Sequence, residues 1–170
     1  MNPEKALVFG LYDPSEVRIV DPSLGRSISL TTKSFPHSFG IGISKKLNKA
    51  GTSIVERLIN KMMRSGQGKR KMSGKYIRGR GGTGKKLQAI GIVREAFEIV
   101  NRETKQNPIQ ILVRAVENSA PREDTTRIKK GGISYTVSVD VSPIKRVDES
   151  LKNLALAAFS SSFNKKISAA

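Results

Sequence analysis

The stretch Ser53-Ile-Val-Glu-Arg-Leu-Ile-Asn-Lys-Met-Met63 predicts an amphipathic helix. Its apolar residues recur at three- and four-residue spacing and therefore share one side of a helix. Arg57, Lys61 and Arg64 fall on the opposite side. The first residue of the stretch and Glu56 have the spacing of a capping box, in which each side chain accepts a hydrogen bond from the other residue's backbone N–H. We expect a helix with one side in a core and one cationic side.

Three further helices are predicted downstream, at about 85–104, 107–120 and from 142 onward, because apolar residues recur there at the same spacing. Asn107 followed by Pro108 marks a helix start, since the Asn side chain caps a backbone N–H and proline suits the first helical position. The helix at 85–104 has an apolar stripe of Leu87, Ile90, Val93, Phe97 and Val100. The fold class is therefore mainly α, with a helical bundle domain.

A protruding β-hairpin is predicted at 125–141, between the last two of these helices. From 133 to 141, apolar residues alternate with polar ones, which is the pattern of a strand with one face in water. Gly131-Gly132 supplies a tight turn, and the segment before it supplies the opposing strand.

The N-terminal part is expected to be a small β appendage, because residues 6–32 read as short strands separated by Asp-Pro turns. At 170 residues, the chain has room for one core with arms attached to it. The expected parts are 1–51 as β appendage and basic arm, 52–166 as helical domain, and 167–170 as a short tail. The helical domain carries a basic insertion at 67–83 and the hairpin at 125–141.

The charge is strongly positive, with 31 Lys plus Arg against 14 Asp plus Glu, a formal net charge of +17 and a pI of about 10.5. Twelve Lys and Arg residues lie from Arg57 to Arg94 without one acidic residue. Such a block requires a polyanion, and nucleic acid offers phosphate neutralisation with counterion release. The glycine-rich insertion cannot bury apolar surface, so we expect it to lack regular structure until RNA orders it.

Three basic elements form the candidate RNA-binding surface. The helix face and insertion carry Arg57, Lys61, Arg64, Lys69, Arg70, Lys71, Lys75, Arg78, Arg80, Lys85 and Lys86. The arm carries Lys45, Lys46 and Lys49, and the hairpin region carries Arg127, Lys129, Lys130, Lys145 and Arg146. This spread suits a folded RNA better than a straight duplex. Because aromatic residues make up only 5% of the chain, backbone and shape recognition should dominate over base stacking.

No catalytic residue, metal site or cofactor is expected. Gly79-Arg-Gly-Gly-Thr-Gly-Lys85 matches the start of a nucleotide-binding P-loop, but an apolar strand before it and a Ser or Thr after the Lys are missing. His37 is the only histidine and there is no cysteine, so we interpret His37 as a surface or RNA-contacting loop residue. Glu123 and Asp124 are interpreted as ion-pair partners of nearby arginines rather than an acid–base pair.

A soluble intracellular protein without membrane contacts is expected. The longest apolar runs fall well short of the roughly 20 residues of a membrane span, and the N-terminus does not resemble a signal peptide.

Several segments of the chain resemble the small-subunit ribosomal protein seven family, in its archaeal and eukaryotic branch. They include Ile54-Val-Glu-Arg-Leu-Ile-Asn-Lys-Met-Met63, Gly84-Lys-Lys-Leu87, Asn107-Pro-Ile-Gln-Ile-Leu-Val113, Glu117-Asn-Ser-Ala-Pro-Arg-Glu-Asp-Thr-Thr-Arg127 and Val139-Asp-Val-Ser-Pro143. The pieces Leu7-Val-Phe-Gly10, Asp21-Pro-Ser-Leu24 and Pro36-His37 are similar to the archaeal and eukaryotic branch. The insertion at 67–83 departs from the family pattern, and we interpret it as an extension that threads into RNA.

The resemblance implies a structural protein of the cytoplasmic ribosome. It would bind small-subunit rRNA in the head, support head assembly, contact other head proteins and lie near exit-site tRNA and the messenger path. By position, Arg57, Lys61, Arg64, Lys85 and Lys86 would face rRNA. Residues 127–135, including Tyr135, would belong to a ribbon near exit-site tRNA. Neither a membrane partner nor a homo-oligomer is expected.

Two other functions stay open on the sequence alone. One is a nucleotide-dependent, P-loop-like RNA remodeller, and the other is a free-standing basic chromatin protein or RNA chaperone.

Overall fold

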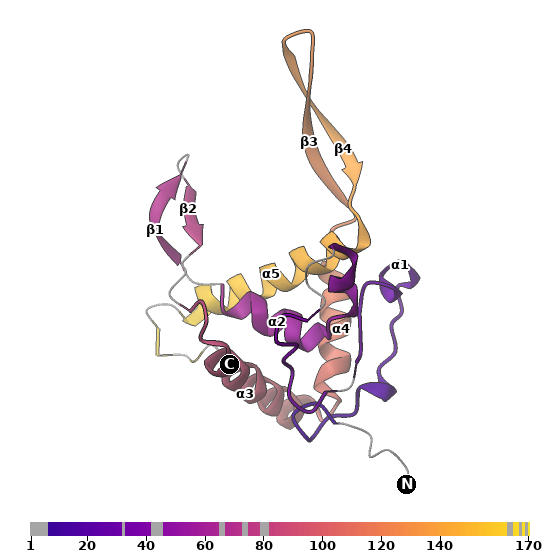
Figure 1. Ribbon diagram of the computed structural model, residues 1–170, viewed down its shortest axis with the longest axis vertical. Helices are drawn as coiled ribbons and strands as arrows, with labels where there is room; N and C mark the ends of the chain where they lie inside the picture. Colours follow the sequence, from indigo (N-terminus) through magenta and orange to yellow (C-terminus); the bar gives the residue numbers. More distant parts are fainter. Residues whose placement is uncertain are drawn as a thin grey trace.

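Four helices of nine to twenty residues form the body of the protein: α2 (Ile54–Met62), α3 (Lys86–Thr104), α4 (Pro108–Ser119) and α5 (Pro143–Ser162). The structure, a computed structural model, describes residues 7–31, 33–41, 46–64, 67–72, 75–78, 82–162, 165–166, 168 and 170. Two antiparallel hairpins project from the helices (Figure 1). The predicted fold class, mainly helical with a protruding hairpin, is confirmed.

The predicted start of α4 is confirmed. The Asn107 side chain accepts a hydrogen bond from the Ile109 N–H at 3.0 Å, and Pro108 occupies the first helical turn. The helix ends at Ser119, directly before Ala120-Pro121. Asn107 also donates to the Asp13 carbonyl at 2.8 Å, which fixes the N-terminal segment beside the helix start.

The capping box predicted for α2 is wrong. Ser53 precedes the helix, but its side chain makes no capping hydrogen bond. Its backbone is instead bridged to Ser29, and the Ile54 N–H donates to the Ser29 carbonyl at 3.0 Å. Glu56 is drawn away from the cap, because Ser38 and Lys86 bind its carboxylate. Tertiary contacts therefore replace the local motif.

The core lies where α2 meets α3, α4 and α5. Ile54, Val55 and Ile59 of α2 are at most 1% exposed, and they pack in one cluster with residues of the other three helices. The expected stripe of α3 reaches this core at Ile90, Val93 and Phe97. Leu87 does not, since it lies in the first turn before the helix meets the core and is 73% exposed.

The β strands predicted at 6–32 are wrong for the described part of that segment. Residues 7–31 form a 3-10 helix η1 (Pro14–Glu16), a short helix α1 (Pro22–Gly25) and isolated bridges. Each Asp-Pro pair begins a helical turn, because the Asp side chain caps a backbone N–H and proline fixes φ. The segment also belongs to the core, to which it contributes Val8, Tyr12, Val17, Leu24 and Ile28.

The predicted hairpin is present as β3 (Glu123–Lys130) and β4 (Ile133–Asp140), paired in register from Glu123↔Asp140 to Lys130↔Ile133. Gly131 and Gly132 have φ of 60° and 82°, as a two-residue hairpin turn with positive φ at both positions requires. The expectation that only one face of the strand meets water is wrong, because every residue of both strands is exposed. The ribbon extends beyond the helices, so they cannot cover it (Figure 1).

The insertion also differs from the expectation of no regular structure. β1 (Gln67–Met72) pairs antiparallel with β2 (Lys75–Arg78), with Lys71↔Tyr76 and Met72↔Lys75 in register. The two strands are adjacent in sequence, so their backbone groups pair as an antiparallel ladder, which the expectation from composition did not consider.

Candidate nucleic-acid interface

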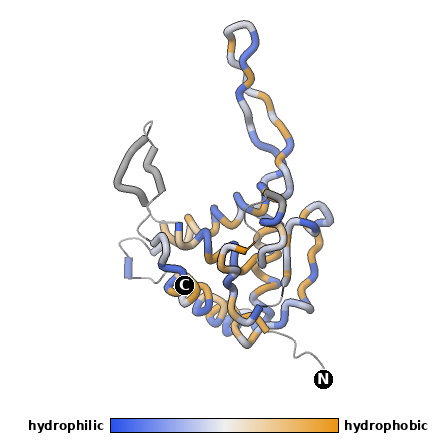
Figure 2. The backbone as a smooth tube through the Cα atoms, viewed as in Figure 1, coloured by the Kyte–Doolittle hydropathy of each residue, from blue (hydrophilic) through white to orange (hydrophobic). Residues whose placement is uncertain are grey.

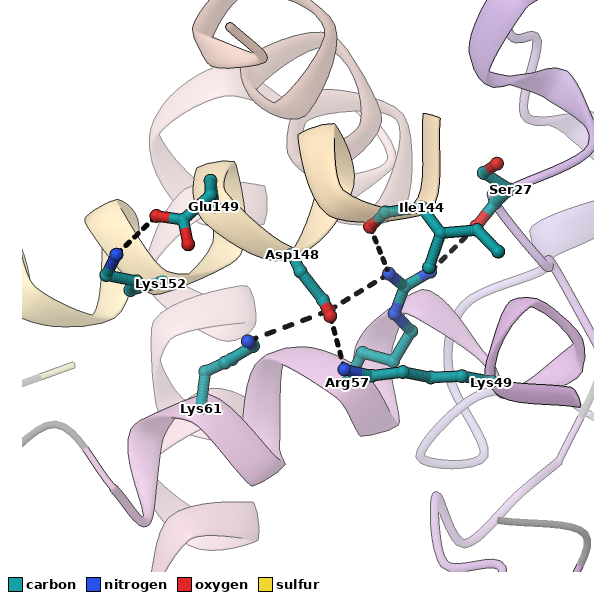
Figure 3. A network of polar contacts seen from close by, with 8 residues as sticks. All are labelled: Ser27, Lys49, Arg57, Lys61, Ile144, Asp148, Glu149 and Lys152. Atoms are coloured by element: carbon teal, nitrogen blue, oxygen red, sulfur yellow. Dashed lines mark hydrogen bonds and ion pairs between the residues drawn. The ribbon is translucent and has the colours of Figure 1, made fainter. Parts of the chain in front are cut away.

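Arg57 lies inside the protein. It is 2% exposed, and its guanidinium donates to the Ser27 carbonyl at 2.7 Å, to the Ile144 carbonyl at 3.5 Å and to Asp148 Oδ1 at 3.1 Å (Figure 3). The expectation that Arg57 lies on a cationic outer face is therefore wrong. A planar group with several donors can join three segments at once, and here it joins α2, α5 and the segment after α1.

Asp148 of α5 gathers three cations. Besides Arg57, it binds Lys49 Nζ and lies 3.6 Å from Lys61 Nζ (Figure 3). Burial alone would raise the pKa of Asp148, but hydrogen bonds from Lys49 and Arg57 and the nearby charge of Lys61 hold it below its ordinary value. One carboxylate opposes three positive charges, so the cluster keeps an excess of positive charge. The Lys49 side chain is 43% exposed, so part of this positive charge lies at the protein surface.

Glu56 is a second internal anion. Its Oε1 accepts from the Ser38 N–H and Oγ–H, both at 2.8 Å, and from Lys86 Nζ at 2.7 Å. Burial would raise the pKa of Glu56, but the bonds from Lys86 and Ser38 keep it below its ordinary value. The Lys86 side chain is 15% exposed, and its ammonium points to Glu56. Its assignment to an RNA-facing surface required the ammonium to point outward, which it does not.

Arg146 is likewise internal, at 6% exposed. Its guanidinium donates to Ser23 Oγ at 2.6 Å and to Asp21 Oδ2 at 3.2 Å, which ties α5 to α1. Hydrogen bonds from Ser23, followed by that from Arg146, lower the pKa of Asp21. The neighbouring Lys145 is exposed and pairs with Asp124 at 2.8 Å, which raises the pKa of Lys145 and anchors the base of the hairpin.

Among the residues whose side chains the structure describes, Arg64 and Lys85 are exposed cations at the joint between α2 and α3. The two helix ends lie close together, because a Cβ at Gly82 would be 2.9 Å from the Met63 carbonyl oxygen. Lys85 also occupies the N-cap position of α3, where unpaired backbone N–H groups favour anions. The joint therefore suits a phosphate group.

The β3–β4 ribbon has two different faces. Since paired residues share a face, Ile128, Ile133, Tyr135, Val137 and Val139 lie on one side. Arg127 and Lys129 lie on the other side, with Lys130 at the tip of the apolar face. Figure 2 shows hydrophobic and hydrophilic positions alternating along the ribbon. The apolar residues are 41–60% exposed, so the ribbon offers water an apolar side and a polar side. The polar side is cationic towards the tip, at Arg127 and Lys129, and carries Glu123 and Asp140 at its base.

The sequence model of the family described as Ribosomal protein S7p/S5e matches residues 27–170. The chain belongs to this family. Curated proteins named small ribosomal subunit protein uS7 are 46% identical to it, among them those of Methanoregula boonei and Cenarchaeum symbiosum, each over 162 residues. These alignments cover 95% of this chain and 72% and 78% of the relatives. The protein of Archaeoglobus fulgidus is 46% identical over 167 residues, which are 98% of this chain and 79% of the relative.

Membership in the S7p/S5e family makes the chain a structural ribosomal protein, associated with small-subunit rRNA, and not an enzyme. The strand that precedes the Gly79–Lys85 motif is β2. β2 pairs in an antiparallel hairpin with β1, whereas a P-loop follows a strand of a parallel sheet. Among the described residues, no group of three or more His, Cys, Asp or Glu side chains could hold a metal ion, and no helix is long and apolar enough to cross a membrane.

The remaining site residues predicted for this S7p/S5e chain are described only in part. Lys45 and Arg80 lie outside the described residues. For Lys46, Lys69, Arg70, Lys71, Lys75 and Arg78, the structure describes the backbone but not the side chain. Asp124 forms an ion pair as predicted, although with Lys145 rather than with an arginine. Glu123 instead accepts a hydrogen bond from the Ser138 hydroxyl.

Sequence reasoning missed the three carboxylates that organise the cations of this family member, Asp21, Glu56 and Asp148. Acidic residues are rare in this chain, with 14 against 31 basic ones, and this imbalance was the signal that could have pointed to the three carboxylates.

Proposed function

We propose that this chain binds the rRNA of the small-subunit head, supports assembly of the head and lies beside exit-site tRNA and the messenger path. The names of the relatives support the ribosomal assignment, and the charge distribution supports the RNA contacts. The α2–α3 joint with Arg64 and Lys85, the exposed edge of the Asp148 cluster at Lys49 and the hairpin cations form the protein side of the contact.

One observation carries this proposal: sixteen strand residues of the β3–β4 ribbon are all exposed and extend away from the helices. A ribbon that leaves its apolar face in water gains stability when a partner covers that face. Arg127, Lys129 and Lys130 add positive charge along β3, towards the tip. We infer that the cationic side meets tRNA or messenger, and that the apolar side meets a neighbouring head protein.

The test uses the purified full chain and transcripts of two small-subunit rRNA domains, one from the head and one from the body. Filter binding over a range of salt concentrations measures affinity for each. We expect tight binding to the head transcript and weak, strongly salt-dependent binding to the body transcript. Equal affinity for both transcripts at every salt concentration would contradict the head assignment. Co-sedimentation with small subunits in high salt then separates an integral subunit protein from a chaperone.

A further inference from the structure

Phe35, His37 and Phe39 form an aromatic stack on the surface. The rings of Phe35 and His37 are nearly parallel, with centroids 6.2 Å apart and an interplanar angle of 6°. The centroids of His37 and Phe39 are 4.1 Å apart, with an interplanar angle of 28°. Phe39 lies at the end of the stack and is 77% exposed, although one side of its ring faces His37. The other side of that ring is therefore open to solvent.

The protein fixes this loop in place. The N–H and Oγ–H of Ser38 both donate to the buried carboxylate of Glu56 at 2.8 Å, and Lys86 neutralises that carboxylate. The Phe39 N–H donates to His37 Nδ1 at 2.8 Å, which holds the imidazole between the two phenyl rings. Phe39 has φ of 51°, in the left-handed region that bulky residues rarely adopt. The fold thus holds a large apolar ring in water, in a conformation that costs free energy.

A pocket of about 450 Å³, lined mostly by residues with polar side chains, adjoins the stack. Ser38 and Ile41, on either side of Phe39, both line it. Lys33 supplies a positive charge, and Asn48 supplies an amide that both donates and accepts hydrogen bonds. Glu56 also lines the pocket, but its carboxylate is paired with Lys86, which leaves the charge of Lys33 available to a phosphate. The volume is that of a small-ligand site. An open aromatic face beside a cation and an amide matches the parts of a nucleotide: a flat base with polar edges, a sugar and a phosphate.

We propose that Phe39 is the stacking platform for one unpaired nucleobase of RNA, and that the adjoining pocket receives the sugar-phosphate of that nucleotide at Lys33. The site rests on the proposed function as an rRNA-binding protein and adds base recognition at one defined position. RNA is favoured over a protein partner because the chain carries a net charge of +17 and the pocket beside the ring is lined mostly by residues with polar side chains, Lys33 among them.

The experiment measures binding of the full chain to the head rRNA transcript over a range of salt concentrations. Phe39→Ala should weaken binding by roughly 5- to 150-fold, the usual effect of removing one base–aromatic stack. The slope of log affinity against log salt should stay unchanged, because the phenyl ring carries no charge that neutralises a phosphate. Phe39→Trp should bind like the parent. Lys33→Ala is the matched control with the opposite signature, a slope shallower by about 0.7 to 0.9.

A second probe is an oligoadenylate that carries one 2-aminopurine, whose fluorescence falls when the base stacks on an aromatic ring. The parent and Phe39→Trp should quench it, and Phe39→Ala should not. Parent-like affinity of Phe39→Ala for the head transcript overturns the stacking site and leaves the proposed function intact. Failure of the parent itself to prefer that transcript overturns the proposed function instead.

Two further outcomes also overturn the site. If Phe39→Ala lowers the salt slope, or if Phe39→Trp fails together with Phe39→Ala, the ring only supports the loop backbone. If Phe39→Ala binds naked RNA like the parent but enters subunits poorly, the ring docks a protein.

Discussion

Arg57 Nη2 of α2 lies 3.1 Å from Asp148 Oδ1 of α5, and this contact joins two helices through residues that are 91 positions apart in sequence. A basic residue that the sequence assigns to the RNA-facing surface thus holds the core together. Arg146 with Asp21, and Lys86 with Glu56, repeat the same arrangement. The protein therefore uses the buried Glu56 and the partly buried Asp21 and Asp148 to retain part of its positive charge for folding, and it exposes the rest.

Asp148→Asn should destabilise the protein by about 3–5 kcal/mol, because it leaves the buried guanidinium of Arg57 without a counter-charge. Urea unfolding followed by circular dichroism measures the decrease. Asp124→Asn is the matched control, since it breaks the exposed pair with Lys145 and should leave the unfolding midpoint unchanged. Similar midpoints for the two variants would mean that the buried Arg57–Asp148 pair contributes no more to stability than the exposed Lys145–Asp124 pair.

Stability should fall as the pH drops below about 4. Glu56 and Asp148 have pKa values lowered in the folded protein, so the unfolded chain binds more protons in acid. Their contribution is complete above the unfolded pKa values, about 4, and disappears as the pH falls through the folded ones. Urea midpoints between pH 7 and pH 3 measure this decline. The double variant Glu56→Gln/Asp148→Asn should show a smaller decline of the urea midpoint with falling pH. An identical decline in parent and variant would show that these two carboxylates do not cause it.

Arg64→Gln with Lys85→Gln should weaken binding to head rRNA and make its salt dependence shallower, by about 0.7 to 0.9 in the log–log slope for each phosphate that is no longer neutralised. Thermal stability should change little, because both side chains are exposed. Arg94→Gln is the control, since Arg94 is also exposed on α3 but pairs with Glu98 at 3.1 Å. A slope unchanged by the double substitution would remove the α2–α3 joint from the proposed interface.

Deleting residues 129–132 and closing the ribbon with a two-residue turn should change stability by less than about 1 kcal/mol, because the ribbon lies outside the core. Subunits with the shortened protein should assemble but crosslink less to exit-site tRNA and messenger. A large drop in the melting temperature, or crosslinking equal to that of the parent, would show that the tip does not serve the proposed contact.

Local patterns predicted the elements whose formation is decided locally. The Asn107-Pro108 start of α4 and the Gly131-Gly132 turn depend on residues within one helical turn or one hairpin. The positions of Arg57 and Arg146 could not be predicted in this way, because their partners Asp148 and Asp21 are 91 and 125 residues away. Periodicity places Arg57 on the polar side of α2, but α5 packs against that side and buries it.

The two-faced ribbon imposes a rule on how its length can vary. Adding one residue to each strand would extend the ribbon by about 3.4 Å and exchange its two sides beyond the insertion, whereas adding two to each would extend it by about 7 Å and keep them. Only even steps would preserve the side on which Ile128 and Tyr135 lie opposite each other. The length of this ribbon can therefore vary in steps of two residues per strand without exchanging its two sides.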